Sequence, residues 1–275
     1  MKKKDPFLGC MVTLYRIDES IGETGVTFLY RARDTHLGVD VALKIMKPQY
    51  SRNEDLQALF VREFDLTADF RHPNVILIHH LGKDNDTVFM AMDLLETSLK
   101  DLMVPGKPMD EDLIIKVGMD VASGLQYVHT EGHIVHRDVQ PENIRFDSDG
   151  NAVLTGFDIA EPLTPDAGKG VFAGNAKYMS PEQAQAYPVD HRADIYSLGV
   201  TLYEMATGRL PFTGRGWFKL ARKHVEELPT PPRDKNPALD PDIERVIIRC
   251  LVKDPAHRYQ TAEELRAELA RRSPA

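Results

Sequence analysis

The hydrophobic pattern of this chain changes its period near residue 96. Before that point, three short stretches have the alternating, β-branched character of strands: TLYRIDESIG, VTFLYRARD and VDVALKIM. After it, apolar residues recur on a helical period through DEDLIIKVGMDVASGLQYVHTEG and RADIYSLGVTLYEMATG, and these patterns stop at Gly132 and Gly208. The order predicts an α+β chain in which a small, mostly β lobe precedes a large, mostly α-helical lobe.

One helix is expected among the strands of the first part. The segment NEDLQALFVREFDLTADF begins at Asn53, a residue type that caps helices. Its apolar positions at near-helical spacing are Leu56, Leu59, Phe60, Phe64 and Leu66. We expect the small lobe over about 12–92, a connecting segment over about 93–97 and the large lobe over about 98–272. The cleft between two such lobes is the usual place for a ligand.

The composition excludes several classes of protein. A net charge of −8 argues against nucleic acid or an anionic membrane as the main partner, because both require a basic patch. The basic run Lys2-Lys3-Lys4 is interpreted as a solvated tail, since no apolar segment of a targeting signal follows it. No apolar run approaches the length of a membrane span, and Cys10 and Cys250 have no metal-like spacing. We therefore expect a cytoplasmic protein.

Five motifs follow one another along the chain: VALKIM, HRDVQPENI, YMSPEQ, RADIYSLGV and KDPAHRYQTAEEL. In this order and approximate spacing they resemble the bacterial, eukaryotic-like (Hanks-type) serine/threonine protein kinases, and the resemblance runs from about Tyr15 to Leu269. Each motif alone is weak, but five in register are specific. The resemblance implies one two-lobed protein kinase-like domain over 1–275, with ATP as cofactor and a protein as substrate or partner.

The resemblance also implies roles for individual residues. Phosphoryl transfer needs positive charge on the phosphates, a metal ion between them and a carboxylate that receives the hydroxyl proton. Lys44 would reach the phosphates and Glu63 would pair with it. The alternative for Glu63 is a surface carboxylate, but its setting in FVRE, on the helix after the lysine strand, favours the pair. Asp138 would be the catalytic base, and Asn143 a metal ligand. Arg137 would normally meet a phosphate in the activation segment.

A second group of residues is implied around the nucleotide. The phosphate-covering loop reads GETGVTFL, in which Gly22 matches the family pattern and Thr24 and Thr27 replace its second and third glycines. Gly25 would supply some flexibility. The residues expected around the adenine ring are Leu29, Ala42, Met92, Asp93, Leu94, Leu95 and Arg145.

A third group is implied as support for the fold. Glu182 and Arg258 would form a buried ion pair, and Asp194 would hold the catalytic loop. His136 would be a buried structural residue. Thr164 is a candidate phosphate acceptor in the activation segment, although a solvated loop threonine is the plainer interpretation.

The chain departs from the family where a metal ligand is expected. Gly156 lies thirteen residues after Asn143, the position of the family's metal-binding aspartate, and Asp158 lies where the family has glycine. Glycine has no side chain with which to bind a metal. Asp158 is roughly 6 to 7 Å further along an extended chain, which is too far without remodelling of the loop.

Two further departures change the charge of the expected site. Gln140 replaces a lysine that neutralises the transferred phosphate, and Asn175 replaces the threonine that this lysine contacts, so we expect a Gln140–Asn175 hydrogen bond. Losing one such charge costs about 3 to 4 kcal/mol of transition-state stabilisation. Arg145 replaces an apolar side chain under the adenine ring. Because a buried, unpaired guanidinium is costly, we expect it to pair with Asp158 or Asp138 and to fill the site.

These departures favour a pseudokinase that binds ATP weakly, has doubtful use for magnesium or manganese, and acts as a scaffold or allosteric partner. The alternative is an active serine/threonine protein kinase with Asn143 and Asp158 as metal ligands, which the retained Lys44, Glu63 and Asp138 favour. A small-molecule phosphotransferase of the same fold is a third class. It is disfavoured because YMSPEQ and DIYSLG belong to the platform for protein substrates.

Overall fold

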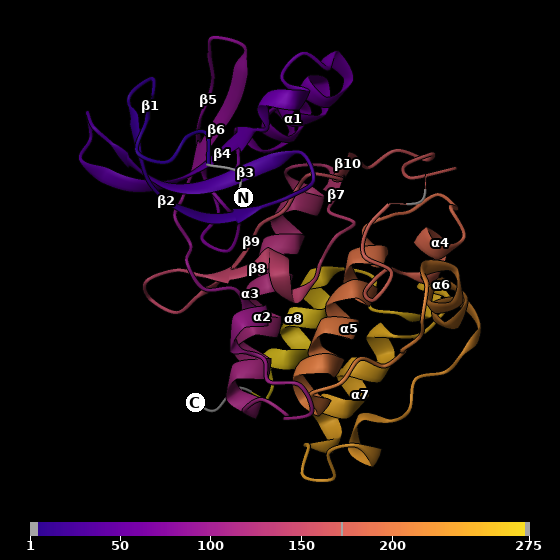
Figure 1. Ribbon diagram of the computed structural model, residues 1–275. Helices are drawn as coiled ribbons and strands as arrows, with labels where there is room; N and C mark the ends of the chain where they lie inside the picture. Colours follow the sequence, from indigo (N-terminus) through magenta and orange to yellow (C-terminus); the bar gives the residue numbers. More distant parts are fainter. Residues whose placement is uncertain (1–4, 172, 273–275) are drawn as a thin grey trace. The chain divides into compact units, whose positions relative to one another are not determined.

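The computed structural model describes residues 5–171 and 173–272, so the basic run Lys2-Lys3-Lys4 lies outside the described residues. The chain forms two compact units (Figure 1). The small unit comprises Met1–Arg71 and Ile76–Leu95, and the large unit comprises His72–Val75 and Glu96–Ala275. Among the described residues, no helix is both long enough and apolar enough to cross a membrane.

The small unit is built on one six-stranded antiparallel sheet with the strand order β1-β2-β3-β4-β6-β5. Its strands are β1 (Met11–Val12), β2 (Tyr15–Glu23), β3 (Thr27–Asp34), β4 (Val39–Met46), β5 (Ile78–Asp84) and β6 (Thr87–Met92). Val41, Leu43 and Ile45 pack on one face of the sheet, while Met46 packs with Phe60 on the other. Since β4 contributes to both cores, it is buried along most of its length and fixes the side chains on both of its faces.

The predicted helix of the small unit is α1 (Glu54–Thr67), which follows the short 3-10 turn η1 (Pro48–Tyr50). Asn53 caps it as expected, because its side chain accepts a hydrogen bond from Leu56 N at 3.0 Å. Phe60 and Glu63 are buried, whereas Leu59 is 51% exposed. The predicted helix is confirmed, and Leu59 is the apolar position of the pattern that lies off its buried side.

The large unit is mostly α-helical. Its helices are α2 (Leu99–Leu102), α3 (Glu111–Thr130), α4 (Pro181–Ala184), α5 (Arg192–Thr207), α6 (Trp217–Glu226), α7 (Pro241–Cys250) and α8 (Ala262–Ala270). Its short turns are η2 (Pro141–Asn143), η3 (Pro232–Asp234) and η4 (Pro255–His257). Two small antiparallel sheets join β7 (Ile134–Val135) to β10 (Glu161–Pro162) and β8 (Ile144–Phe146) to β9 (Ala152–Leu154).

Helix α5 is the centre of the large unit, and α3, α7 and α8 pack against it (Figure 1). It is buried from Ala193 to Thr207, so its sequence has no clear polar face. The helix ends as predicted at Gly208, which has a left-handed φ of 68°. The predicted stop of α3 at Gly132 is displaced, because α3 ends at Thr130 and the left-handed residue is His133.

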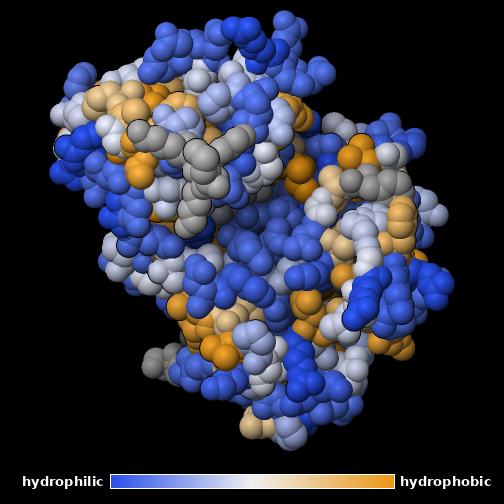
Figure 2. Space-filling view, viewed as in Figure 1, coloured by the Kyte–Doolittle hydropathy of each residue, from blue (hydrophilic) through white to orange (hydrophobic). Residues whose placement is uncertain are grey.

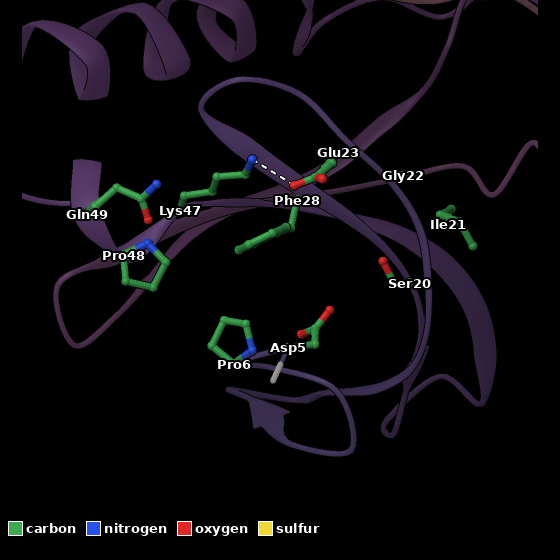
Figure 3. Close-up of a pocket in the computed structure, with 10 residues that line it drawn as sticks. All are labelled: Asp5, Pro6, Ser20, Ile21, Gly22, Glu23, Phe28, Lys47, Pro48 and Gln49. Atoms are coloured by element: carbon green, nitrogen blue, oxygen red, sulfur yellow. Dashed lines mark ion pairs between the residues drawn. The ribbon is translucent and has the colours of Figure 1, made fainter. Parts of the chain in front are cut away.

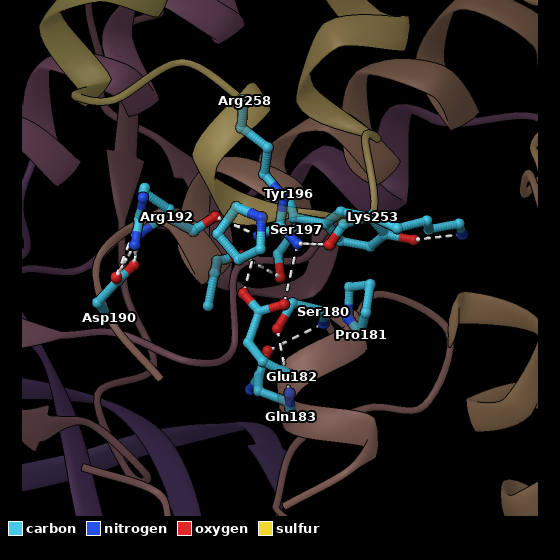
Figure 4. Close-up of polar contacts among 12 residues, drawn as sticks. Ser180, Pro181, Glu182, Gln183, Asp190, Arg192, Tyr196, Ser197, Lys253 and Arg258 are labelled. Carbon is cyan, nitrogen blue, oxygen red and sulfur yellow. Dashed lines mark hydrogen bonds and ion pairs between the residues drawn. The ribbon is translucent and has the colours of Figure 1, made fainter. Parts of the chain in front are cut away.

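A buried ion pair ties the segment around α4 to the C-terminal part of the large unit (Figure 4). The two terminal nitrogens of Arg258 bond to the two carboxylate oxygens of Glu182 at 2.8 and 2.9 Å. Arg258 also donates to the carbonyls of Val252 and Lys253, so its donors are satisfied although only 1% of the residue is exposed. This confirms the predicted pair.

Candidate functional site

The small unit contains the predicted pair of Lys44 and Glu63. Lys44 lies on β4 opposite Leu29, and its Nζ donates to Glu63 Oε2 on α1 at 2.7 Å. Each side chain is only 9% exposed, so the cation is held by charge and by burial of its stem. The pairing is confirmed, and a role for Lys44 in phosphate binding stays a prediction.

The loop that we expect to cover the phosphates, GETGVTFL, is closed by hydrogen bonds between Thr24 and Thr27, which stand where the family has glycine. Thr24 Oγ1 lies 2.8 Å from Thr27 Oγ1 and accepts from Thr27 N at 3.0 Å, and Thr24 N donates to Thr27 O at 2.8 Å. A Cβ added at Gly25 would have no atom within 4 Å, and one at Gly22 would meet only Leu29 Cβ at 4.0 Å. The turn is therefore shaped by threonine hydrogen bonds, and neither glycine is required by close packing.

A pocket of about 800 Å³ lies beside this loop within the small unit (Figure 3). Phe28 points into it. Lys47 Nζ forms an ion pair with Glu23 Oε2 at 2.8 Å and lies 4.9 Å from the centre of the Phe28 ring. Leu29, Ala42 and Lys44 do not line it. Side chains alternate along a strand, so this pocket lies on the opposite face of β3 from the expected adenine contact Leu29.

The residues expected near the adenine edge lie at the end of β6 and just beyond it. Met92 pairs with Ala42 across the sheet. Asp93 Oδ1 lies 2.9 Å from His79 Nε2, and the backbone N of Asp93 donates to Leu77 O. Leu95 is 8% exposed and is the last residue of the small unit.

In the large unit, the side chain of Asp138 is oriented by two amides. Gln140 Nε2 and Asn143 Nδ2 both donate to Asp138 Oδ2, at 2.8 and 2.7 Å. Gln140 Oε1 in turn accepts from Asn175 Nδ2 at 2.7 Å, which confirms the predicted hydrogen bond. The network positions a carboxylate without supplying positive charge, and both of its donors bond to the same oxygen of Asp138, Oδ2.

Asp194 and His136 hold the backbone of residues 136–138, which belong to the expected catalytic loop HRDVQPEN. Asp194 Oδ1 accepts from Arg137 N at 2.7 Å and Oδ2 from His136 N at 2.8 Å, as predicted. His136 Nε2 donates to Thr155 O at 2.9 Å, and its Nδ1 accepts from Asp138 N at 3.2 Å. Burial lowers the pKa of His136, which fits this neutral tautomer and the predicted structural role.

Gly156 has a backbone conformation that glycine favours. Its φ is 79°, and a Cβ there would lie 2.5 Å from Asn143 Cγ and Oδ1. The Asn143 amide cannot move without cost, because it donates to both the backbone and the side chain of Asp138. The backbone conformation at position 156 and the position of Asn143 therefore both favour glycine over aspartate in this structure.

Asp158 lies in an exposed turn that Ala160 N closes by donating to Phe157 O at 3.1 Å. Phe157 is buried and packs edge-on against His136, with ring centroids 4.6 Å apart. Among the described residues, no three His, Cys, Asp or Glu side chains cluster in a way that could hold a metal ion. The side chains present do not fit an ion that requires a carboxylate at position 156.

Arg145 has partners in the large unit other than the carboxylates that we expected. It bridges to Ser98 through the backbone, and its Nη1 donates to Glu96 O at 3.2 Å. Burial lowers the pKa of Arg145, and the charge of Asp101 on α2 raises it. The backbone bridge places Arg145 beside the start of α2, and its pairing with Asp138 or Asp158 stays a prediction.

Arg137 has a carboxylate partner that was not predicted from the sequence. Arg137 Nη1 lies 2.6 Å from Glu161 Oε1, and Gly168 N donates to Glu161 Oε2 at 2.7 Å. The Arg137 side chain is 2% exposed, so Glu161 supplies the anion that this buried cation requires. Thr164 is exposed. An acid four residues after Phe157, on the strand that pairs with β7, was the available signal.

Comparison with known proteins gives the same identification. The protein kinase domain model matches residues 15–269. The chain is 36% identical over 258 residues to a probable serine/threonine-protein kinase of Clostridium perfringens, covering 93% of this chain and 38% of that protein. It is 33% identical to the serine/threonine-protein kinase PrkC of Bacillus subtilis, covering 93% of this chain and 40% of PrkC.

The serine/threonine-protein kinase PknB of Mycobacterium tuberculosis is 35% identical, with 94% of this chain and 42% of PknB covered. The chain thus spans about two fifths of the length of the curated relatives that it matches. The small unit with its sheet and one helix, and the helical large unit, are the two lobes of an α+β kinase fold. The chain therefore belongs to the protein kinase family, as a domain of the bacterial serine/threonine kinase type.

Proposed function

We propose that this domain is a pseudokinase with weak or no phosphoryl transfer, which acts as a scaffold or allosteric regulator of a protein partner in bacterial cytoplasmic signalling. The observation that carries the proposal is Gly156. It stands where the family has its metal-binding aspartate, and a side chain there would be strained by the left-handed backbone and would have to displace the Asn143 amide. The position has no carboxylate, and one introduced there would disturb the Asn143 amide that bonds to Asp138.

The second support is the neutral catalytic loop. Gln140 keeps the hydrogen-bonding geometry that orients Asp138, but it brings no charge to the transferred phosphate. Loss of one preorganised charge costs about 3 to 4 kcal/mol of transition-state stabilisation, or roughly 100- to 1000-fold in rate. A missing metal carboxylate adds to this cost, since the metal neutralises the developing charge.

ATP and a divalent metal are used throughout the kinase family, and we propose that this domain retains weak, largely metal-independent ATP binding. The Lys44–Glu63 pair supports it, because a cation remains available for the phosphates. The residues proposed to contact the nucleotide are Gly22, Gly25, Leu29, Ala42, Lys44, Met92, Asp93, Leu95 and Arg145.

Thermal unfolding with ATP, with and without magnesium or manganese, tests this function. A ligand stabilises by RT ln(1 + [L]/Kd), so millimolar ATP against a comparable Kd adds less than about 1 kcal/mol. We expect the melting temperature to respond slightly to ATP and scarcely to the metal. A clear magnesium-dependent rise at micromolar ATP would overturn the proposal.

The second candidate is an active serine/threonine kinase in which Asn143 and Asp158 hold the metal. The formed Lys44–Glu63 pair and the oriented Asp138 favour it. Under this candidate, Asp158→Asn and Asp138→Asn each abolish autophosphorylation from radiolabelled ATP, and manganese serves better than magnesium because it tolerates looser geometry. Autophosphorylation that survives Asp158→Asn would exclude Asp158 as the ligand.

A further inference from the structure

Phe218 on α6 is the most exposed of the large apolar aromatic side chains in the described part of the chain, at 81%. It packs edge-on against Trp217, with ring centroids 5.2 Å apart. One exposed apolar residue needs no explanation by itself. The basic side chains around Phe218 distinguish it from an isolated exposed residue.

The segment that leads into α6, together with most of that helix, is basic in an otherwise acidic protein. Between Met205 and Val225 there are five Lys and Arg residues and no Asp or Glu, whereas the whole chain has a net charge of −8; the acids Glu226, at the end of α6, and Glu227 follow directly. Arg215 and Lys219 are exposed, and neither forms an ion pair with a described residue. Arg222 pairs with Glu226 at 3.1 Å, but its side chain is 77% exposed, so this pair is worth little and is open to exchange.

These side chains gather on one part of the helix. Phe218 and Arg222 are four residues apart, and Lys219 and Arg222 are three apart, which places each pair side by side on a helical surface. Arg215 immediately precedes the cap residue Gly216. We name Arg215, Phe218, Lys219 and Arg222 the α6 surface.

The opposite side of α6 is fixed in the core. His224 Nδ1 lies 3.0 Å from Tyr196 Oη on α5, and Lys253 Nζ donates to His224 O at 2.6 Å. Burial lowers the pKa of His224 to about 3, so the imidazole is neutral. Leu220 is buried on the same side. The helix cannot turn Phe218 inward without breaking these contacts, so the α6 surface is presented by a rigid element.

We propose that the α6 surface is a docking site for an acidic protein segment that carries one apolar anchor residue. The anchor would cover Phe218, and acidic side chains on either side would meet Arg215 and Lys219. Aromatic and arginine side chains are the types that dominate binding at protein interfaces. The inference goes beyond the proposed function and does not depend on phosphoryl transfer; it gives the partner of the proposed scaffold a chemical class.

Selection from a random peptide library displayed on phage tests the proposal with the whole chain as bait. We expect the enriched peptides to be net acidic and to carry Phe, Leu or Trp. In fluorescence anisotropy with one synthetic enriched peptide, Phe218→Ala and Lys219→Glu should each weaken binding by roughly ten-fold or more. Binding should also weaken as salt is added.

Matched controls separate the α6 surface from general stickiness. Leu228→Ala removes an apolar side chain that is 83% exposed, and Lys83→Glu reverses an exposed charge in the small unit; both should leave peptide affinity unchanged. Enriched peptides without net acidic charge, no enrichment at all, or affinity insensitive to the Phe218 and Lys219 variants would each overturn the proposal. So would Lys219-dependent sedimentation with phosphatidylserine vesicles in the absence of peptide binding, which would indicate a lipid surface. None of these readouts requires ATP, so their failure is distinct from failure of the pseudokinase proposal.

Discussion

Two polar networks of the large unit each provide hydrogen-bond partners for a charged side chain, but one does so with charged groups and the other with amides. The network of Glu182 and Arg258 keeps its full charges, and every Arg258 donor group finds a partner. The network of Asp138, Gln140 and Asn175 keeps its geometry, but amides stand where the family has a cation and a hydroxyl. Between these two networks, the full charges remain in the one that supports the fold, and the cation is missing from the one beside Asp138.

The largest expected effect is on the charged network. Glu182→Ala leaves the Arg258 guanidinium buried and unpaired, so we expect the free energy of unfolding to fall by about 3 to 5 kcal/mol in urea denaturation. Glu263→Ala is the control, because Glu263 and Arg266 form an exposed pair (48% and 38%) and its loss should cost under about 0.5 kcal/mol. A loss below about 1 kcal/mol for Glu182→Ala would show that Arg258 is stabilised by backbone carbonyls alone.

Glu161 tests whether a charge near the catalytic loop is structural. We expect Glu161→Ala to cost about 2 to 3 kcal/mol, since Arg137 loses its carboxylate while Glu161 is the more exposed partner, at 22%. Limited proteolysis should then cut more rapidly between Phe157 and Ser180, and added sulfate should restore part of the protection. Thr164→Ala should change neither property, because Thr164 is exposed. Equal sensitivity of the two variants would contradict an ordering role for Glu161.

The side-chain pairs of the fold and site could be predicted from the sequence, but the backbone conformation at Gly156 could not. The Gln140–Asn175 bond could be predicted, because motif spacing fixes both positions and their side chains are complementary. The left-handed φ of Gly156 could not, since it depends on packing against Asn143 and not on a pattern. The partners of Arg145 and the role of Glu161 were missed for a related reason. Several acids lie within reach of a long arginine side chain, and local strand pairing decides among them.

A substitution at Gly156 tests whether the structure around the missing metal ligand resists a side chain. We expect Gly156→Ala to cost about 1 to 3 kcal/mol, because it combines left-handed strain with a clash against Asn143. Gly150→Ala isolates the strain, since Gly150 has a φ of 76° and no atom within 4 Å of an added Cβ. If the two variants lost the same free energy of unfolding, the Asn143 side chain would move aside at no cost.

Restoring transfer is accordingly harder than restoring the motif. Gly156→Asp combined with Asp158→Gly and Gln140→Lys returns the family residues, but the carboxylate introduced at position 156 also requires the Asn143 amide to leave Asp138. We expect the triple variant to show magnesium-dependent ATP binding only if that amide moves, which the thermal shift with and without magnesium measures.

The smallest effect is expected at Asn175, where only a neutral hydrogen bond is at stake. Asn175→Thr retains a donor for Gln140 Oε1, so the free energy of unfolding should change by less than about 0.5 kcal/mol, whereas Asn175→Val removes the donor and should cost about 1 kcal/mol. The order of the two variants matters more than either value. If Asn175→Val were as stable as Asn175→Thr, the amide network would not hold Asp138 in place. The orientation of that carboxylate would then come from Asn143 alone, which donates to both its Oδ2 and its backbone oxygen.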